Sequence, residues 1–267
     1  MSHETARAPA SLERTSVEPT GSHGQREAGR GSGWDRRRVE TAARILDAAE
    51  RIASDEGLES LTMQRLGAEL GYRAGALYRY FPSKDALLAA LLVRIVHEVS
   101  AMVRAASEEA AAVAERARRP LTKSARQLLP LVLTARGYLA LADERPAQMA
   151  LLVRALAAPR PVVDDASAGA LASAAFVLLR EASAVFSAAR EAGVLDAGDD
   201  TQRVALLWVS LHGIVGNRKL ARFGVAGLAP SALVNELVRA LLVGWGASRA
   251  DVDDCIDRAA RAAAREG

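Results

Sequence analysis

The sequence predicts an all-α protein. Apolar residues recur at helical spacing along most of the 267-residue chain, and runs of β-branched residues that alternate with polar ones are absent. Hydrophobic residues make up 50% of the chain, with alanine prominent among them, which suits closely packed helices. Glycines and prolines separate these segments, for example at Gly57, Gly71, Pro82 and Pro146, as is typical of helix ends.

The beginning of the chain has a different composition. Residues 1–35 are rich in Ser, Gly, Arg and Glu and lack periodic apolar residues, so we expect a disordered extension there. Arg36, Arg37 and Arg38 follow. They either reach into the minor groove of DNA or form a solvated run of charge at the start of a helix.

Three short helical segments are predicted next, over about 39–56, 63–70 and 73–80. Gly57 is placed to end the first in a left-handed conformation, and Thr62 to cap the second with its hydroxyl. Gly71 permits a tight turn between the second and the third. Pro82 then stops the third segment, and Ser83 caps a long helix that runs to about residue 117.

Aromatic and basic residues concentrate on the second and third segments. Aromatic residues make up only 4% of the chain, yet four of them lie between positions 72 and 81, interleaved with basic side chains: Tyr72, Arg73, Tyr78, Arg79, Tyr80, Phe81 and then Lys84. Two short helices cannot stand alone, so they must pack on the first and present a surface. We interpret Leu77 and Phe81 as core, and the unit as a helix-turn-helix that binds duplex DNA.

Further helices are predicted over 121–142, 146–157, 164–191, 201–220, 231–246 and 251–265. The single cysteine, Cys255, and the four scattered histidines offer no disulfide and no metal-ligand cluster, so we expect no metal and no cofactor. No apolar run is read as transmembrane, and no signal peptide is seen. These observations predict a cytoplasmic protein that is not bound to a membrane and is not an enzyme.

The N-terminal unit resembles the TetR family of bacterial transcriptional regulators. The residues that carry the resemblance are Ile45 to Ala53, Gly57, Leu61, Thr62, Leu66, Gly71, Gly75 and the string from Leu77 to Lys84. The resemblance implies a DNA-binding domain over 36–95 and a helical ligand-binding and dimerisation domain over 96–267. Relatives commonly carry Ser and Thr where this chain has Arg73 and Ala76, so the start of the reading helix departs from the family pattern.

The resemblance and the groove geometry together assign a set of DNA contacts. We expect Thr62, Tyr80 and Lys84 to contact phosphates, and the reading surface to comprise Arg73, Ala74, Gly75, Ala76, Tyr78 and Arg79. Three of these assignments have alternatives. Gly75 either lets the backbone approach DNA or accommodates helix packing, and Tyr78 and Tyr80 either contact DNA or pack between helices.

The resemblance also implies a homodimer through about 201–220 and 231–246 and a ligand cavity among the helices from about 121 to 191. Candidate ligand contacts in that region are Arg136, Tyr138, Met149, Arg154, Phe176, Arg180 and Phe186. Trp208, His212 and Gly213 look like the Trp-x-x-x-His-Gly signature of one group of TetR C-terminal domains. We assign Trp208 and His212 to the dimer interface or the core.

These observations predict a ligand-responsive regulator, acting as a repressor, that binds a pseudo-palindromic operator in double-stranded DNA and is released by a small-molecule effector. One alternative is an all-helical enzyme or small-molecule carrier that uses the C-terminal cavity. Another is a regulator that responds to a protein partner.

Overall fold

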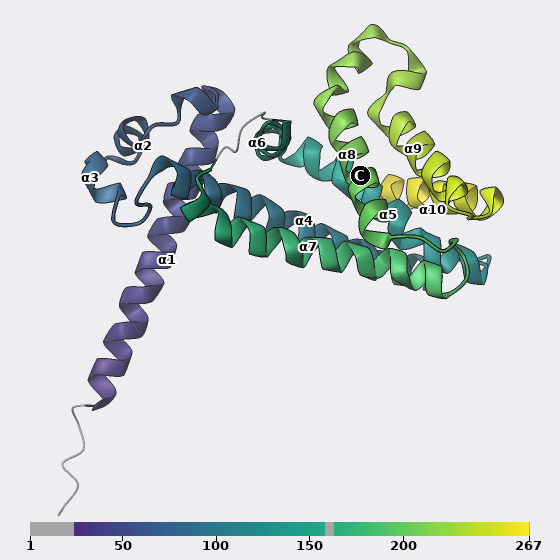
Figure 1. Cartoon of the computed structure of the whole chain (residues 1–267), viewed down its shortest axis with the longest axis horizontal. Coiled ribbons are helices and arrows are strands. Elements are labelled where there is room, and N and C mark those ends of the chain that lie inside the picture. The colour runs from purple at the N-terminus through teal and green to yellow at the C-terminus, as the bar shows by residue number, and fades with distance from the viewer. Residues whose placement is uncertain (1–23, 158–162, 267) are drawn as a thin grey trace, which may run out of the picture. The chain divides into compact units, whose positions relative to one another are not determined.

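The computed structural model describes residues 24–157 and 163–266, and these residues form helices and no strand (Figure 1). The all-α prediction is confirmed. The α-helices are α1 (Gly24–Asp55), α2 (Met63–Leu70), α3 (Ala74–Leu77), α4 (Lys84–Glu115), α5 (Lys123–Glu144), α6 (Pro146–Ala157), α7 (Asp165–Glu191), α8 (Asp200–Gly216), α9 (Pro230–Gly244) and α10 (Arg249–Glu266); the 3-10 helices are η1 (Leu58–Ser60), η2 (Arg218–Phe223) and η3 (Ala226–Leu228).

Helix α1 begins earlier than the sequence predicts. Disorder was expected over 1–35, but α1 extends back to Gly24. No proline interrupts these residues, and extending an existing helix adds a hydrogen bond for each residue ordered. The rest of the expected extension, residues 1–23, lies outside the described part of the chain. By their contacts, residues up to Ala42 and from Ala43 onward form separate units.

The second unit contains a small core that holds α2 and α3. Ile45 and Ile52 of α1 are buried, as are Leu61, Leu66 and Leu77. A completely buried leucine stabilises a fold by about 1.5–3 kcal/mol relative to an exposed one. The short helices therefore owe their stability to this apolar contact and not to their own hydrogen bonds.

Helix α3 is shorter than predicted. We expected a helix over 73–80, whereas α3 covers only Ala74–Leu77. Gly75 is a weak helix former, and Arg73 at the N-cap makes no side-chain capping bond. After Leu77 the chain turns, with the backbone N–H groups of Tyr80 and Phe81 both donating to the Leu77 carbonyl oxygen at 2.9 and 3.0 Å.

Helix α4 links the short helices to the rest of the second unit. It runs without a break across position 95, where the sequence placed a domain boundary. It packs along α5 and α7, while α10 packs on α5 and α8 packs on α7 and α9 (Figure 1). Capping side chains begin several of these helices: Ser83 accepts from the Ala86 N–H at 2.9 Å and Thr122 from the Ala125 N–H at 2.9 Å.

Helices α4 and α7 are long and apolar enough to cross a membrane by length and composition, although no apolar run in the sequence was read as transmembrane. More than half of the apolar window of α4 is buried inside the protein, as in the core helix of a soluble domain, whereas that of α7 is mostly exposed. Two such helices are weak evidence, and they do not indicate a membrane protein.

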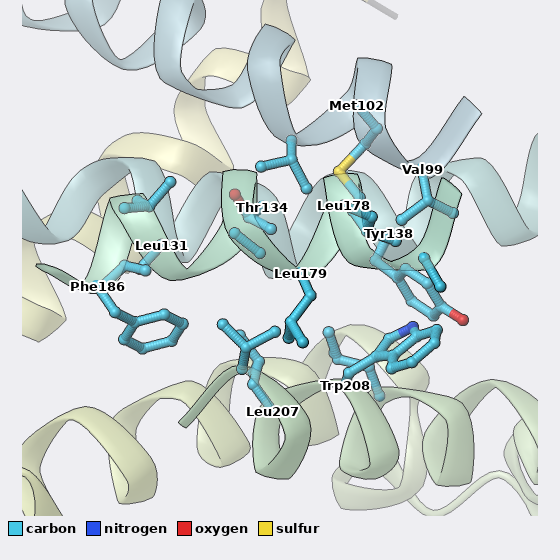
Figure 2. Close-up of a pocket in the computed structure, with 16 residues that line it drawn as sticks. Val99, Met102, Leu131, Thr134, Tyr138, Leu178, Leu179, Phe186, Leu207 and Trp208 are labelled. Carbon is cyan, nitrogen blue, oxygen red and sulfur yellow. The ribbon is translucent and has the colours of Figure 1, made fainter. Parts of the chain in front are cut away.

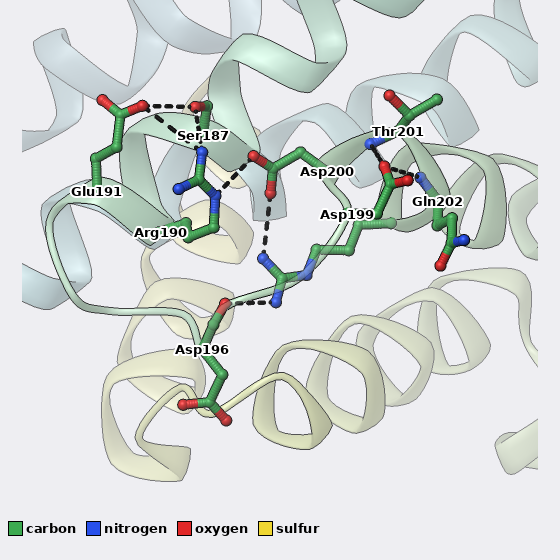
Figure 3. A network of polar contacts seen from close by, with 9 residues as sticks. Ser187, Arg190, Glu191, Asp196, Asp199, Asp200, Thr201 and Gln202 are labelled. Atoms are coloured by element: carbon green, nitrogen blue, oxygen red, sulfur yellow. Dashed lines mark hydrogen bonds and ion pairs between the residues drawn. The ribbon is translucent and has the colours of Figure 1, made fainter.

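A polar network joins the end of α7 to the start of α8 (Figure 3). Asp200 accepts from Arg190 Nε at 2.9 Å and from Arg203 at 3.2 Å. Arg203 is only 5% exposed and also donates to the carbonyl oxygen of Asp196 at 2.7 Å. Its guanidinium lies 5.6 Å from the centre of the Trp245 ring, so this network ties α7 and α8 to the end of α9.

Candidate functional site

The turn between α2 and α3 has the geometry of a helix-turn-helix. Thr62 caps α2 by accepting from the Arg65 N–H at 3.1 Å, and Gly71 ends it in the left-handed conformation with φ of 68°. A Cβ on Gly67 would lie 2.7 Å from the carbonyl oxygen of Tyr72, so the chain after the turn passes very close to α2. The capping and turn residues expected from the sequence hold these positions.

Most of the predicted reading residues share an accessible surface. Arg73, Tyr78 and Arg79 are exposed, and a Cβ added to Gly75 would meet nothing within 4 Å. Tyr78 is 49% exposed, which argues against the alternative that it packs between helices. The open space at Gly75 likewise argues against a packing role for that glycine.

The predicted phosphate contacts lie beside this surface. Thr62 is exposed, whereas Tyr80 and Lys84 are half-buried. Lys84 is the first residue of the 32-residue helix α4, after the N-cap Ser83. Its ammonium group therefore adds to the positive end of the helix dipole, where an anionic oxygen is favoured.

Arg65 forms ion pairs with two glutamates of the protein. Its guanidinium donates to Glu56 at 2.5 Å and to Glu69 at 3.0 Å, which joins α2 to the end of α1. The hydrogen bond from Arg65 holds the pKa of the Glu56 carboxyl below its ordinary value. Arg65 is one of the basic residues around the aromatic cluster, but its role here is to orient α2.

A narrow cavity of about 70 Å³ lies between α4, α5, α7 and α8 (Figure 2). Tyr138 and Trp208 stand at one end and Phe186 at the other. The lining side chains are mostly aliphatic: Val99, Met102, Val103, Leu131, Thr134, Tyr138, Ala175, Leu178, Leu179, Ala182, Val185, Phe186, Val204, Leu207, Trp208 and Leu211. The cavity is thus almost entirely apolar.

Two of the seven candidate ligand residues, Tyr138 and Phe186, line this cavity. Phe176, which is 71% exposed, and Arg180 lie on the outer face of α7, because residues 178, 182 and 186 occupy its inner face. Met149 is buried but is not part of the lining. These three residues therefore do not line this cavity.

Arg136 and Arg154 also lie outside the cavity, and each contacts a polar partner elsewhere. Arg136 donates to Asn235 on α9 at 3.2 Å. Arg154 lies 3.4 Å from Glu59 in η1, at the surface. No arginine contributes to the lining of the apolar cavity, so the cavity offers no cationic partner to an acidic ligand.

Trp208 and His212 form a cluster with Tyr138 that was not predicted from the sequence. His212 is 8% exposed, and a ring nitrogen lies 3.0 Å from Tyr138 Oη, while its Nδ1 lies 2.9 Å from the Trp208 carbonyl oxygen. The Trp208 and His212 rings meet edge to face at 4.9 Å. Trp208 therefore belongs to the cavity wall. Because Trp208 and His212 are four residues apart, both were expected on one face of a helix. The spacing does not determine whether that face lines the cavity.

Burial keeps the ionisable members of this cluster uncharged. Burial lowers the pKa of the His212 imidazole below its ordinary value and raises the pKa of the Tyr138 hydroxyl above its ordinary value. Both groups are neutral near pH 7. The polar end of the cavity consequently offers hydrogen bonds and no formal charge.

Comparison with known proteins gives a match confined to the N-terminal region. Residues 45–91 match the family described as bacterial regulatory proteins, tetR family. The HTH-type transcriptional repressor DrrR1 of Streptomyces coeruleorubidus is 49% identical over 55 residues, which are 21% of this chain and 20% of that protein. The chain therefore matches only about a fifth of the length of this curated relative.

Solved structures are similar over a longer part of the chain. A bacterial regulatory protein in the tetR family from Rhodococcus RHA1 has a TM-score of 0.54 at 18% identity, covering 78% of this chain and 97% of that chain. The transcriptional regulator FadR from Bacillus subtilis, solved in complex with stearoyl-CoA, has a TM-score of 0.56 at 14% identity, covering 76% of this chain and 98% of that chain. At these identities the likeness shows a shared fold.

Proposed function

The chain belongs to the tetR family of bacterial regulatory proteins through its N-terminal region, and on this premise we propose that it is a cytoplasmic, ligand-responsive transcriptional repressor. It acts as a homodimer on a pseudo-palindromic operator, without catalysis. The observation that carries this proposal is the exposed set of Arg73, Tyr78 and Arg79 on a capped helix-turn-helix with a buried core.

DNA recognition divides between reading and anchoring groups. Helix α3 and the turn after it enter the major groove, where Arg73 and Arg79 can donate two hydrogen bonds each to a guanine. Lys84, Tyr80 and the start of α2 at Thr62 hold the protein to phosphates. Because Arg73 stands at the N-cap of α3 without a capping bond, it is placed to contact DNA at the point where relatives commonly have a hydroxyl.

Lys84→Ala is expected to weaken binding to operator and to unrelated DNA by a similar factor. Each phosphate contact releases counterions, so the slope of log affinity against log salt should fall by about 1. Fluorescence anisotropy over a salt series measures this slope. Lys123→Ala is the matched control, because Lys123 is likewise the first residue of a helix after a capping hydroxyl. A salt slope unchanged by Lys84→Ala would remove Lys84 from the interface.

Arg73→Ala and Arg79→Ala are each expected to relax the preference at one base pair of each half-site. A good bidentate contact discriminates by about 1–3 kcal/mol. Selection of bound DNA from a random pool, carried out with each variant, reports the altered position directly. Arg126→Ala, an exposed arginine on α5, should leave the selected sequence unchanged. Identical selected sequences for wild type and both variants would refute the reading role.

The dimer interface is proposed on α8 and α9, close to the ranges 201–220 and 231–246 predicted from the sequence. Leu206 and Val209 are 54% and 68% exposed on one face of α8, and Gly213 and Gly216 continue that face. The glycines, which have no side chain, would let a second helix approach closely, and that helix would then bury Leu206 and Val209. If a second copy of the chain covers this face, α8 and α9 of both copies form a four-helix bundle. That bundle sets the distance between the two helix-turn-helix units.

Ligand response is proposed to pass through α4. Arg94 of α4 contacts Asp47 at 2.6 Å and also pairs with Glu50, which ties the helix to α1. Val99, Met102 and Val103, within the next turns of α4, line the cavity. A ligand that favours a different position of α4 therefore changes the distance between the two helix-turn-helix units of the dimer. Selection of an operator, followed by ligand-dependent release from it, tests the whole proposal; an effector that binds without changing operator affinity would refute it.

A further inference from the structure

We infer that the cavity takes an uncharged, mainly apolar ligand whose single hydrogen-bond acceptor is bound by the indole N–H of Trp208. This inference rests on the proposed function, because it names the class of effector that the regulator would bind. Three features of the cavity carry it: its lack of charge, its buried polar atoms without partners, and its apolar far end.

Charge is excluded from the cavity by its lining. Of the lining residues only Tyr138 is titratable, and burial raises its pKa. His212 behind it is held neutral by burial. A carboxylate that entered would lose its hydration without gaining a cationic partner, which is strongly unfavourable.

Trp208 supplies the donor. Its Nε1 is buried and lies near the Tyr138 hydroxyl, whose pKa is raised by burial and, to a smaller extent, lowered by this contact, but no acceptor among the described residues meets it in good hydrogen-bond geometry (Figure 2). An indole N–H can only donate, and the His212 ring, edge to face against it, holds it in place. A ligand group that forms a hydrogen bond with this N–H must therefore be an acceptor, such as a ketone, ester or ether oxygen.

Thr134 adds a second polar atom to the same cavity. Helical threonines often donate to the carbonyl four residues earlier, but Thr134 Oγ1 is buried and has no partner among the described residues. It lies one turn before Tyr138 on the cavity face of α5. A hydroxyl can donate or accept, so Thr134 can donate to the same ligand oxygen as Trp208.

The opposite end is closed by apolar rings. Phe186 meets Trp245 edge to face at 5.6 Å between ring centres. A smaller space of about 10 Å³ lies beyond it, lined by Leu131, Phe186, Leu207, Val238, Leu241, Leu242 and Trp245. The ligand is therefore oriented with its oxygen at Trp208 and its hydrocarbon part toward Phe186 and α9.

Binding to the full chain without DNA tests this orientation and class. The probes are straight-chain methyl ketones of increasing length, the 2-methyl-1-alkenes of the same shape, in which a methylene replaces the oxygen, and carboxylates of the same length. Isothermal titration calorimetry should rank the ketone of best length above its alkene and the carboxylate last. One net hydrogen bond corresponds to a preference for the ketone of about threefold to tenfold.

Two variants and one control identify the groups responsible. Trp208→Phe should remove that preference and leave alkene binding unchanged, whereas Trp245→Phe should keep the preference. Thr134→Val should raise the unfolding midpoint of the ligand-free protein, because it removes a buried hydroxyl without a partner. A hydroxyl with a purely structural role would give a lower midpoint.

The proposal is overturned if no ketone binds, if a carboxylate binds most tightly, or if Trp208→Phe weakens ketone and alkene equally. These outcomes are separate from failure of the proposed function. A protein that binds ketones but is not released from its operator refutes the regulatory mechanism alone. One that is released by a carboxylate refutes only the ligand class.

Discussion

Val209→Arg is expected to dissociate the homodimer and to abolish high-affinity operator binding. Val209 is 68% exposed in the single chain, and in the proposed four-helix bundle it would be covered by a second copy. A two-fold interface uses the same patch on both subunits, so each interface would receive two arginines. An unpaired buried charge costs about 3–5 kcal/mol, or a factor of hundreds to thousands in association. Sedimentation equilibrium measures the dissociation, and gel shift measures the loss of binding.

Phe176→Arg provides the matched control. Phe176 is 71% exposed on α7, outside the proposed interface, so its replacement by the same residue should leave the mass in solution unchanged. A dimer that survives Val209→Arg would contradict the interface on α8. Dissociation by Phe176→Arg instead would place the interface on α7.

Asp200→Ala is expected to destabilise the fold by about 3–5 kcal/mol. The change removes the acceptor shared by Arg190 and Arg203, and leaves the charge of Arg203 almost completely buried with only the Asp196 carbonyl as an acceptor. Urea unfolding followed by circular dichroism gives the free energy of unfolding and the change produced by the substitution.

The neighbouring aspartate offers a control in the same turn. Asp199 is exposed and caps α8, accepting from the N–H groups of Thr201 at 2.8 Å and Gln202 at 3.2 Å (Figure 3). Asp199→Ala should cost only about 1 kcal/mol, the usual value of an N-cap. Equal losses for the two variants would show that the buried ion pair adds nothing beyond the cap.

Local signals in the sequence predicted much of the fold. Thr62, Gly71 and Ser83 act as caps and turn in the structure as expected, because a capping bond or a left-handed turn depends on a few neighbouring residues. Leu77 and Phe81 were predicted as core by the same short-range reasoning, and both are buried. The length of α3 was wrong because a weak cap and Gly75 limit a helix that its apolar pattern would extend.

The candidate ligand site depended on information that local patterns lack. Arg180 and Phe186 lie on the same predicted helix, and both were candidate ligand contacts. The packing of α7 against α4 and α8 turns Phe186 toward the cavity and Arg180 away from it. The same packing brought Trp208 from α8 to Tyr138 of α5. Periodicity identifies helix faces, whereas only the neighbouring helices decide which face encloses a cavity.

The sequence by itself therefore determined the helical class, the ends of most helices and the helix-turn-helix with its exposed arginines. Each of these depends on hydrogen bonds and apolar contacts between residues close in the chain. The tertiary structure alone decided that the cavity is uncharged, that Trp208 faces it and that Asp200 holds a buried arginine. Those features arise where helices distant in sequence pack together, and there burial sets the charge and hydrogen bonding of each side chain.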